Sequence, residues 1–551
     1  RTFRRKKDAE ELSCGFEEKK YSASTDAIFA QRYGAYYKAD ASTRQLYGDL
    51  MLNIDKYFGD FSLTATLGAS IQDVNYAYYS VGGDLNSVAN SFTLKNLNLA
   101  NAEHDQDGYH DQTQSLFATA QLGWQSKLYL DVTGRIDWSS ALAWTNSKNV
   151  AYPSVGLSAI LTDLFPIKND VLTFLKVRAS YSEVGNAPTR YIAYQTFPYQ
   201  SGTPTTASTY PNSDIKPERT KAWEVGLQSN FWGDKLSLSV SLYKTSTYNQ
   251  LFNPSLSASS GYTSIYINGG QVDNKGIELG LSLNQDLGPV KWNSNFTYTL
   301  NRNEIKKLLK PTTLASGLTI QQDVLDLGGV GNVMTRLTEG GSIGDLYVTA
   351  LRTDEHGYID VDYVNNTVSI DKNAGDRKDG WVYAGNAQPK YTLGWRNSFS
   401  WKGLNLGFLI NARVGGIGVS MTQALMDAYG TSQASADARD AGGVIINGSL
   451  VPAAQKYYQT VGTGAGSMYV YSATNVRLAE LSLGYDVPVS KVVPWIKGLN
   501  VAFTGHNLFM FYCKAPYDPE LTASTATHFA GMDYFMLPSL RNLGFSVRLN
   551  F

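Results

Sequence analysis

The most informative stretch of the sequence is its last eleven residues, Arg541-Asn542-Leu543-Gly544-Phe545-Ser546-Val547-Arg548-Leu549-Asn550-Phe551. Apolar and polar side chains alternate along this stretch. Since successive side chains of an extended strand point to opposite faces, one face is apolar and the other polar. The apolar face carries Leu543, Phe545, Val547, Leu549 and Phe551. An edge strand of a soluble sandwich has the same alternation, so this stretch alone predicts only a one-sided strand.

The same alternation recurs along the chain, usually in pairs of runs joined by a short polar turn. The paired runs cover residues 46–71, 116–136, 223–242, 277–300 and 391–412. Each run is about ten residues long, the length of a tilted strand that crosses a bilayer. The pattern predicts an antiparallel meander of about sixteen strands. In the third pair, Leu238 and Val240 are predicted to meet lipid, while Ser239 and Ser241 face the interior.

The connections favour a membrane barrel over a sandwich. Short turns alternate with long excursions at roughly 185–217, 246–274, 302–388, 415–472 and 510–536. Outer-membrane barrels have short periplasmic turns and long extracellular loops, whereas a compact soluble domain rarely carries several unstructured loops of that length. Aromatic residues precede the short turns, as in the girdles of barrels at the membrane interface. They are Phe58, Trp124, Phe231, Trp232, Phe399 and Trp401.

Composition sets further bounds. The 551 residues have a net charge of −1 and a mean hydropathy of −0.24. No run of eighteen apolar residues exists, which excludes helical membrane spans, and the balanced charge gives no case for nucleic-acid binding. Residues 1–24 are polar and are predicted to be a loop or unstructured, ahead of a barrel over 25–551. Cys14 and Cys513 are far apart in sequence, and nothing in their spacing indicates whether they pair.

Chemical motifs are scarce. His104 and His110 stand in an acidic stretch that predicts a solvated loop, with a metal site as the alternative. A second acidic stretch predicts a charged surface loop, with calcium as the alternative, although the spacing of an EF-hand is missing. Its carboxylates are Asp354, Asp360, Asp362, Asp371, Asp376 and Asp379. No catalytic triad can be assembled. We therefore expect no catalytic, cofactor-binding or metal-binding residue and no enzymatic activity.

Tyrosines gather in two of the predicted loops. They are Tyr191, Tyr194, Tyr199, Tyr210, Tyr262 and Tyr266. Their rings are suited to stacking on sugars or on peptide side chains, to contacts with a partner protein, or to packing loops against each other. We favour packing, and the sequence assigns no substrate-binding residue.

Several segments, in the same order along the chain, resemble the SusC/RagA family of TonB-linked outer-membrane transporters of Bacteroidetes. They are residues 116–123, 128–140, 152–158, 174–186, 215–226, 481–485, 505–509 and 517–520. The resemblance covers roughly residues 110–551. Two positions depart from it: Ile136 stands where a polar residue is expected, and the Asp-rich segment at 376–380 is shortened.

The resemblance implies most of the expected function. Members of the family have 22-stranded barrels, so about six strands, the plug domain and the TonB box would lie outside this chain. It implies import of glycan oligomers or peptides across the outer membrane, with a SusD-like surface lipoprotein and the TonB complex as partners. The barrel insertion machinery would read a terminal signal formed by Phe545, Val547, Leu549 and Phe551. A passive porin and a barrel enzyme remain as alternatives.

Overall fold

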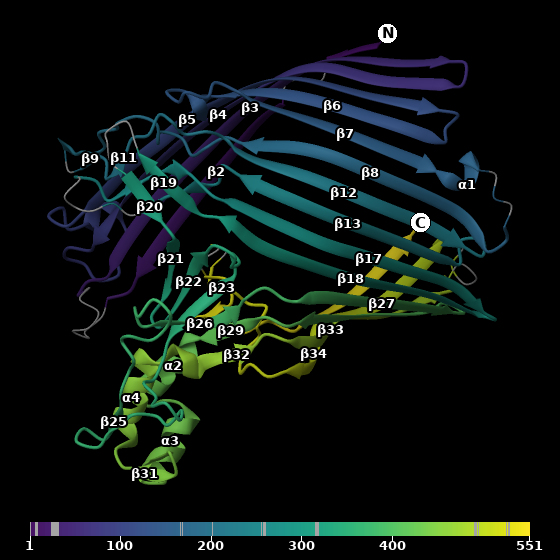
Figure 1. The fold of residues 1–551 in the computed structure, drawn as a ribbon. Helices are drawn as coiled ribbons and strands as arrows, with labels where there is room; N and C mark the ends of the chain where they lie inside the picture. The colour runs from purple at the N-terminus through teal and green to yellow at the C-terminus, as the bar shows by residue number, and fades with distance from the viewer. Residues whose placement is uncertain are drawn as a thin grey trace. The chain divides into compact units, whose positions relative to one another are not determined.

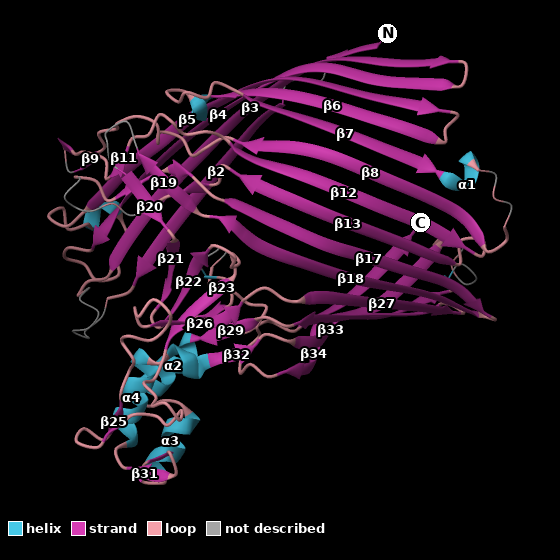
Figure 2. Cartoon of the chain, in the orientation of Figure 1, coloured by secondary structure: helices cyan, strands magenta, loops and turns pink. Residues whose placement is uncertain are grey.

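The largest element of the computed structural model is one antiparallel sheet of seventeen strand segments (Figures 1 and 2). The structure describes the whole chain except residues 1, 6–8, 24–31, 166, 168, 201, 255, 257–260, 314–318, 490–492, 494, 525 and 527–528. Two of the segments, β1 (Thr2–Arg5) and β2 (Ala9–Tyr21), pair with different stretches of β3 (Ala35–Phe58). Seventeen segments therefore occupy sixteen positions, which confirms the predicted number of strands.

The chain divides into two compact units. The first comprises residues 1–157, 181–220 and 251–268, and the second comprises 158–180, 221–250 and 269–551. In the first unit β3 pairs with β4 (Phe61–Asp84), β4 with β5 (Glu103–Trp124), and β5 with β6 (Leu128–Ser139). Small two-stranded pairs complete this unit: β9 (Tyr199–Gln200) with β10 (Thr203–Pro204), β11 (Thr209–Tyr210) with β15 (Ser264–Ile265), and β14 (Leu251–Phe252) with β16 (Ile267–Asn268).

Two predictions for the first unit are wrong. Ala9–Tyr21 is not a loop but strand β2, because its backbone pairs with residues 35–47 of β3. His104 and His110 do not lie in a solvated loop either, because β4 and β5 continue their pairing up to Gly82 and Glu103. A charged sequence therefore extends as strand where its neighbour offers a hydrogen-bonding edge.

In the second unit each strand pairs with the next one along the chain. The order is β13 (Leu236–Tyr248), β17 (Gln271–Leu287), β18 (Val290–Lys307), β27 (Tyr391–Trp401), β28 (Leu404–Val414), β33 (Asn475–Val487), β34 (Gly498–Cys513) and β36 (Asn542–Asn550). Three further strands belong to the same sheet: β7 (Val150–Ile160), β8 (Leu172–Asn186) and β12 (Glu218–Phe231). Each contains a residue boundary between the first and the second unit. The one-turn helix α1 (Leu161–Leu164) follows β7.

The predicted alternation of faces is confirmed in β13. In the antiparallel pairing of β13 with β17, Leu238, Val240 and Leu242 lie opposite Leu281, Leu279 and Ile277. Leu242 is 49% exposed, whereas Ser241 is buried and accepts a hydrogen bond from Arg178. In β13 one face is therefore apolar and the other is polar.

The long excursions predicted at 302–388, 415–472 and 510–536 lie in the second unit and contain helices and strands of their own. They fold together at one end of the strands, which Figure 1 shows below β18 and β27. We call this region the loop subdomain. It contains β21 (Val324–Val330), β22 (Val333–Thr338), β23 (Asp345–Thr349), β26 (Trp381–Asn386), β29 (Ile417–Ser420), α2 (Met421–Ala428), α3 (Gln433–Asp440), α4 (Ala454–Gly464), β32 (Val470–Ser472) and β35 (Met532–Asp533).

A hydrophobic core holds the loop subdomain together. Its fully buried members include Leu346, Val419, Ala424, Val461 and Met532, which come from all three excursions. The hydroxyls of Ser420 and Ser432 cap α2 and α3 by accepting from the backbone N–H groups of Gln423 and Ser435. Burial therefore joins segments that are distant in sequence, whereas the caps fix the helix starts locally.

Short elements complete the loops of the second unit. They are β19 (Leu309–Thr313), β20 (Thr319–Gln322), β24 (Val361–Asp362), β25 (Thr367–Val368), β30 (Val444–Ile446) and β31 (Ser449–Val451). Within the described part of the chain, no helix has the length and apolar character needed to cross a membrane.

Aromatic rings pair beside the short turns, as the sequence predicts. Phe58 and Phe61 stack across the β3–β4 turn with ring centroids 5.8 Å apart. Trp292 and Phe399 stack between β18 and β27 at 6.0 Å, close to the β17–β18 and β27–β28 turns. Such rings favour the interface between lipid and water.

Candidate functional site

The polar face of the sheet carries an ion pair in the second unit. Arg178 of β8 donates from Nη2 to Glu224 of β12 at 2.7 Å and to Ser241 of β13 at 2.8 Å. Gly226 makes room for this arrangement, since a Cβ atom there would lie 2.6 Å from Nε of Arg178. One guanidinium thus joins three consecutive positions of the meander on the face opposite the exposed apolar side chains.

Carboxamides continue this polar face toward the loop subdomain. Asn301 and Asn303 of β18 both donate to Oδ1 of Asn274 in β17, at 3.3 and 2.9 Å. Tyr243 of β13 donates to Asn301 at 3.3 Å, and its ring lies over Gly276, where a Cβ atom would come within 2.4 Å of the ring. This part of the face therefore presents amide groups and a tyrosine ring, which suit hydrogen bonding and stacking with a polar solute.

In the first unit, an arginine fastens a long loop to a strand. Arg190 donates to both carboxylate oxygens of Asp111 in β5, at 2.6–3.2 Å, and lies 3.6 Å from the ring centroid of Tyr109. Tyr109 in turn stacks on Tyr76 of β4 at 5.0 Å. A bidentate pair with ring stacking is a strong, directional contact, so the loop that follows β8 is anchored to the polar face.

A cleft opens where β18 continues beyond its neighbour. The pairing of β18 with β27 ends at Thr299 and Thr392, while β18 runs on to Lys307. The cleft has a volume of about 600 Å³ and is lined by fifteen residues. Among them are Asn301, Arg302, Asn303, Asn386, Gln388 and Lys390. We call it the β18 cleft, and its size is within the range of small-molecule sites.

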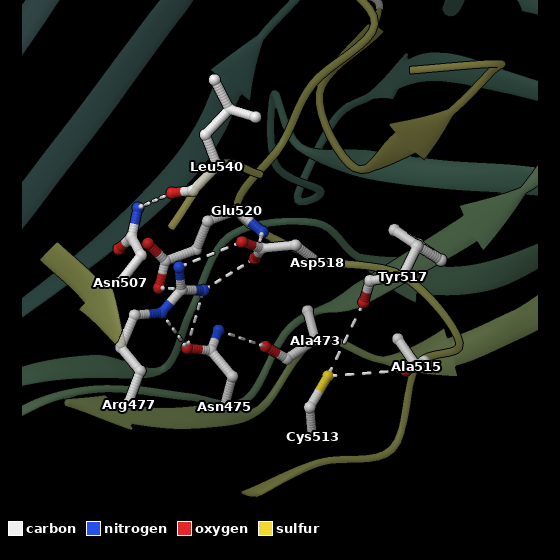
Figure 3. Close-up of polar contacts among 10 residues, drawn as sticks. All are labelled: Ala473, Asn475, Arg477, Asn507, Cys513, Ala515, Tyr517, Asp518, Glu520 and Leu540. Atoms are coloured by element: carbon white, nitrogen blue, oxygen red, sulfur yellow. Dashed lines mark hydrogen bonds and ion pairs between the residues drawn. The ribbon is translucent and has the colours of Figure 1, made fainter. Parts of the chain in front are cut away.

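A buried charge cluster ties the last excursion to β33 (Figure 3). Arg477 is almost fully buried and binds Asp518 through two hydrogen bonds of 2.7 and 3.1 Å, with Glu520 at 3.2 Å and Asn475 at 3.1–3.2 Å. Burial alone would raise the pKa of the Asp518 carboxyl, but the hydrogen bonds and charge of Arg477 outweigh it. The pKa of Asp518 therefore lies below its ordinary value. This cluster holds a loop in place rather than presenting a reactive group.

Tyrosine hydroxyls stabilise the interior of the loop subdomain. Tyr469 donates to the buried carboxylate of Asp427 at 2.8 Å, and burial together with that carboxylate raises the pKa of Tyr469. Burial and the nearby Asp345 likewise raise the pKa of Tyr383 to about 12. Both phenols stay neutral donors at physiological pH, so they serve as structural hydrogen-bond donors.

The predicted terminal strand is present as β36, and it pairs with β34. Phe545, Val547 and Leu549 lie opposite Phe503, Val501 and Leu499. The ring of Phe551 stacks on that of Trp495, with centroids 5.7 Å apart and planes 6° from parallel. The geometry is that of a strand end fixed to the preceding hairpin, while the role of these residues as an assembly signal stays a prediction.

Three of the six loop tyrosines pack against other aromatic rings, as the favoured interpretation predicts. Tyr210 meets Tyr262 at 5.1 Å, and Tyr194 meets Trp144 at 5.3 Å. Tyr262 also bonds to Gln195 at 3.0 Å. Packing accounts for these rings, and a further contact with solute or partner stays a prediction for those that are exposed, such as Tyr199.

The acidic stretches take part in local structure. Asp354 and Asp362 accept backbone N–H bonds within their own turns, and Asp379 pairs with Arg336 at 2.8 Å. His110 bonds to Asp73 at 2.8 Å. Among the described residues no group of three or more His, Cys, Asp or Glu side chains is placed to hold a metal ion. Cys14 and Cys513 are free thiols, so the pairing left open by the sequence is not formed.

The polar face could be found from the alternation, but the β18 cleft and the Arg477 cluster could not. Asp518 and Glu520 follow Arg477 by 41 and 43 positions in the chain, and only the fold of the last excursion brings them to it. No signal in the sequence indicates that pairing.

The chain is similar to known proteins over most of its length. Residues 15–508 match the family model described as "TonB dependent receptor-like, beta-barrel". The chain belongs to this TonB-dependent receptor family. Its members are outer-membrane proteins of Gram-negative bacteria, so the sheet is the wall of an outer-membrane β-barrel and its apolar face meets lipid. Short turns of such barrels face the periplasm and long loops face outward.

Two relatives come from Formosa agariphila. TonB-dependent receptor P3 is 25% identical over 535 residues, which is 91% of this chain and 52% of that protein. TonB-dependent receptor P26 is 25% identical over 503 residues, 83% of this chain and 48% of that protein. The chain therefore spans about half the length of these TonB-dependent receptors.

Solved structures of other proteins share this fold. The RagAB peptide importer in its "open-open" state matches 99% of this chain and 58% of its own, with a TM-score of 0.76 and 18% identity. The structure of the RagAB peptide transporter matches with a TM-score of 0.73 and 17% identity, over 99% and 59% of the two chains. At this identity the likeness concerns the fold, and it agrees with the architecture that the sequence resemblance implied.

Proposed function

We propose that this chain is the barrel of a TonB-energised importer that takes up a nutrient oligomer, a glycan or a peptide, through the outer membrane. The observation that carries the proposal is the match of residues 15–508 to the receptor barrel family. It is supported by a polar face rich in amides and ion pairs, which suits passage of a polar solute, and by a folded loop subdomain at the outer end of the strands.

A SusD-like surface lipoprotein is the proposed partner that delivers the substrate. The resemblance of the sequence segments to the SusC/RagA family supports this partner, as does the fold shared with RagAB. The TonB complex is the proposed source of energy. We also propose that the chain has no enzymatic activity, because no catalytic constellation can be assembled from the side chains that the structure describes.

The proposal is tested by uptake in the bacterium that encodes the protein. A strain with the full-length gene deleted should stop accumulating one labelled oligomer, and the gene returned on a plasmid should restore it. Uptake by the complemented strain should cease when a protonophore collapses the energy supply of TonB. Uptake that survives the protonophore would instead indicate a passive porin, and hydrolysis of the oligomer by purified protein would indicate an enzyme.

A further inference from the structure

The charge of the β18 cleft differs from that of the rest of the polar face. Of its fifteen lining residues, nine carry a hydroxyl or a carboxamide, two are cationic, and none is Asp or Glu. The two cations are Arg302 and Lys390. Elsewhere on the polar face the guanidinium of Arg178 is matched by Glu224 and that of Arg396 by Glu480. The lining of the cleft thus carries positive charge and no acidic residue.

Neither cation has an acidic partner among the described side chains. Arg302 donates from Nη1 to the backbone oxygen of Lys390 at 3.0 Å, which joins the two sides of the cleft and leaves its charge uncompensated. The stem of Lys390 lies against Gly415, where a Cβ atom would come within 2.6 Å of it, so Lys390 requires a glycine at that position. Gly415 has φ +81°, which also favours glycine.

Asp345 is bonded to residues of the lining but does not line the cleft itself. Its carboxylate is buried and accepts from Asn386 at 2.8 Å, from Tyr383 at 3.3 Å and from the backbone N–H of Ser342 at 2.7 Å. These bonds orient Asn386 and Tyr383, both of which line the cleft. The Asp345 carboxylate thus positions neutral groups in the lining, and its own oxygens are occupied by these donors.

We propose that the β18 cleft binds a carboxylate-bearing oligosaccharide, with Arg302 and Lys390 binding the carboxylate and the surrounding amides and hydroxyls binding the sugar hydroxyls. The inference rests on the proposed import function and narrows its substrate to an acidic glycan. A glycan fits better than a peptide because the nine hydroxyl and amide groups supply both donors and acceptors. The lining has few branched apolar side chains that would hold peptide side chains, Ile417 among them.

The test uses the full-length transporter purified in detergent and two probes of equal length. One probe is tetragalacturonate, and the other is its methyl ester, which keeps the sugars and removes the charge. Isothermal titration should show the acid binding at least about tenfold more tightly than the ester, since charge-assisted hydrogen bonds are stronger than neutral ones. Added salt should weaken the binding of the acid and leave that of the ester unchanged.

Matched variants assign the effect to the two side chains. Arg302→Gln and Lys390→Gln should each weaken the acid about tenfold without changing the ester, whereas Arg302→Lys should keep most of the affinity. Lys372→Gln, at an exposed lysine of the same loop region, is the control and should bind both probes as the wild type does. Heat-modifiability on gels verifies that each variant is folded before titration.

Four results would overturn the inference: no binding of tetragalacturonate, equal affinity for acid and ester, no effect of Arg302→Gln and Lys390→Gln, or competition by triglutamate as effective as that by tetragalacturonate. Titration requires no transport, so the two proposals can fail separately. Acid binding that depends on Arg302 in a protein whose uptake needs no TonB would leave the cleft assignment standing and remove the import mechanism.

Discussion

At the scale of single residues, position on one or the other face of a strand decides what a side chain does. Ser241 and Leu242 are neighbours in the chain, yet the first binds Arg178 and the second is 49% exposed on the apolar face. The sequence predicts this division because the period of two is strict in a strand. It cannot predict which polar residues on the inner face meet, since partners such as Arg178 and Ser241 are 63 positions apart.

The facing of β13 can be tested with arginine scanning. Val240 lies four residues into the strand, roughly 13 Å along it at about 3.3 Å per residue, whereas Leu238 lies only two residues in. Arginine on the lipid face costs about 2–4 kcal/mol at the midplane and about 0–1 near the interface. Val240→Arg should therefore lower the folded yield in outer membranes most, Leu238→Arg less, and Ser239→Arg least. A greater loss for Ser239→Arg than for Val240→Arg would reverse the assigned faces.

The Arg477 cluster predicts how the last excursion responds to mutation. Asp518→Asn removes the charge and one of the two acceptor oxygens that hold Arg477, and leaves the buried guanidinium with Glu520 as its acidic partner and Asn475 as a neutral acceptor. Breaking a buried ion pair costs up to about 3–5 kcal/mol. Limited proteolysis should cleave the variant near residues 514–524 faster than the wild type, with Asp440→Asn at an exposed helix end as the unaffected control. Equal cleavage rates would show that the pair contributes little.

The Arg477–Asp518 pair also makes the stability of the last excursion depend on pH. Because the pKa of Asp518 is depressed in the folded protein, its stabilisation is present above the ordinary value of about 3.9. It is lost as the pH falls below that value and through the folded-state pKa. Proteolysis of the wild type by an acid-stable protease should accelerate as the pH falls from 5 to 3. Asp518→Asn should show a smaller acceleration, and an unchanged profile would contradict the role of this carboxyl.

At the scale of elements, the strands were predictable and the loops were not. Alternation identified the pairs from 46–71 to 391–412, and the terminal strand β36 is present where it was predicted. The same reasoning missed β2, because Glu17, Glu18 and Lys19 are polar on both faces, and there pairing with β3 decides the structure. It also missed α2 and α4, whose apolar residues become a core only when distant segments meet.

Two variants test whether Phe551 acts as an assembly signal or through its packing on Trp495. Phe551→Ser should slow insertion of the full-length protein, because the aromatic end is presented to the insertion machinery before folding. Trp495→Ala removes only the ring that stacks on Phe551 in the folded protein, worth about 0.5–1.5 kcal/mol. It should lower stability slightly and leave the rate of insertion unchanged, as measured by pulse-chase and heat-modifiability. Equal slowing by both variants would show that Phe551 acts through the stack.

At the scale of the whole molecule, the periodic pattern predicts a membrane barrel and the family follows from matching sequence segments, whereas the candidate binding cleft is formed by tertiary contacts. A strand pattern with a period of two, short turns and flanking aromatics is repeated many times, so errors in single strands do not change the conclusion. The β18 cleft is formed once, by residues from 299 to 417 that no repeat marks. Substrate chemistry is therefore accessible from the structure and from binding experiments rather than from the pattern.

The loop subdomain should unfold separately from the strands, since its hydrophobic core is formed by its own three excursions. Leu346 has no exposed surface, and Leu346→Ala should cost about 2–5 kcal/mol through lost burial and the cavity left behind. Leu450→Ala, at a side chain that is 56% exposed in the same subdomain, is the matched control and should cost little. Hydrogen exchange should then accelerate in residues 324–386 and 417–472 of the first variant alone, while β13, β17 and β18 keep their protection. Loss of protection in these strands together with the loops would mean that the barrel wall and the loop subdomain form one cooperative unit, and that the long loops are a structural part of the wall.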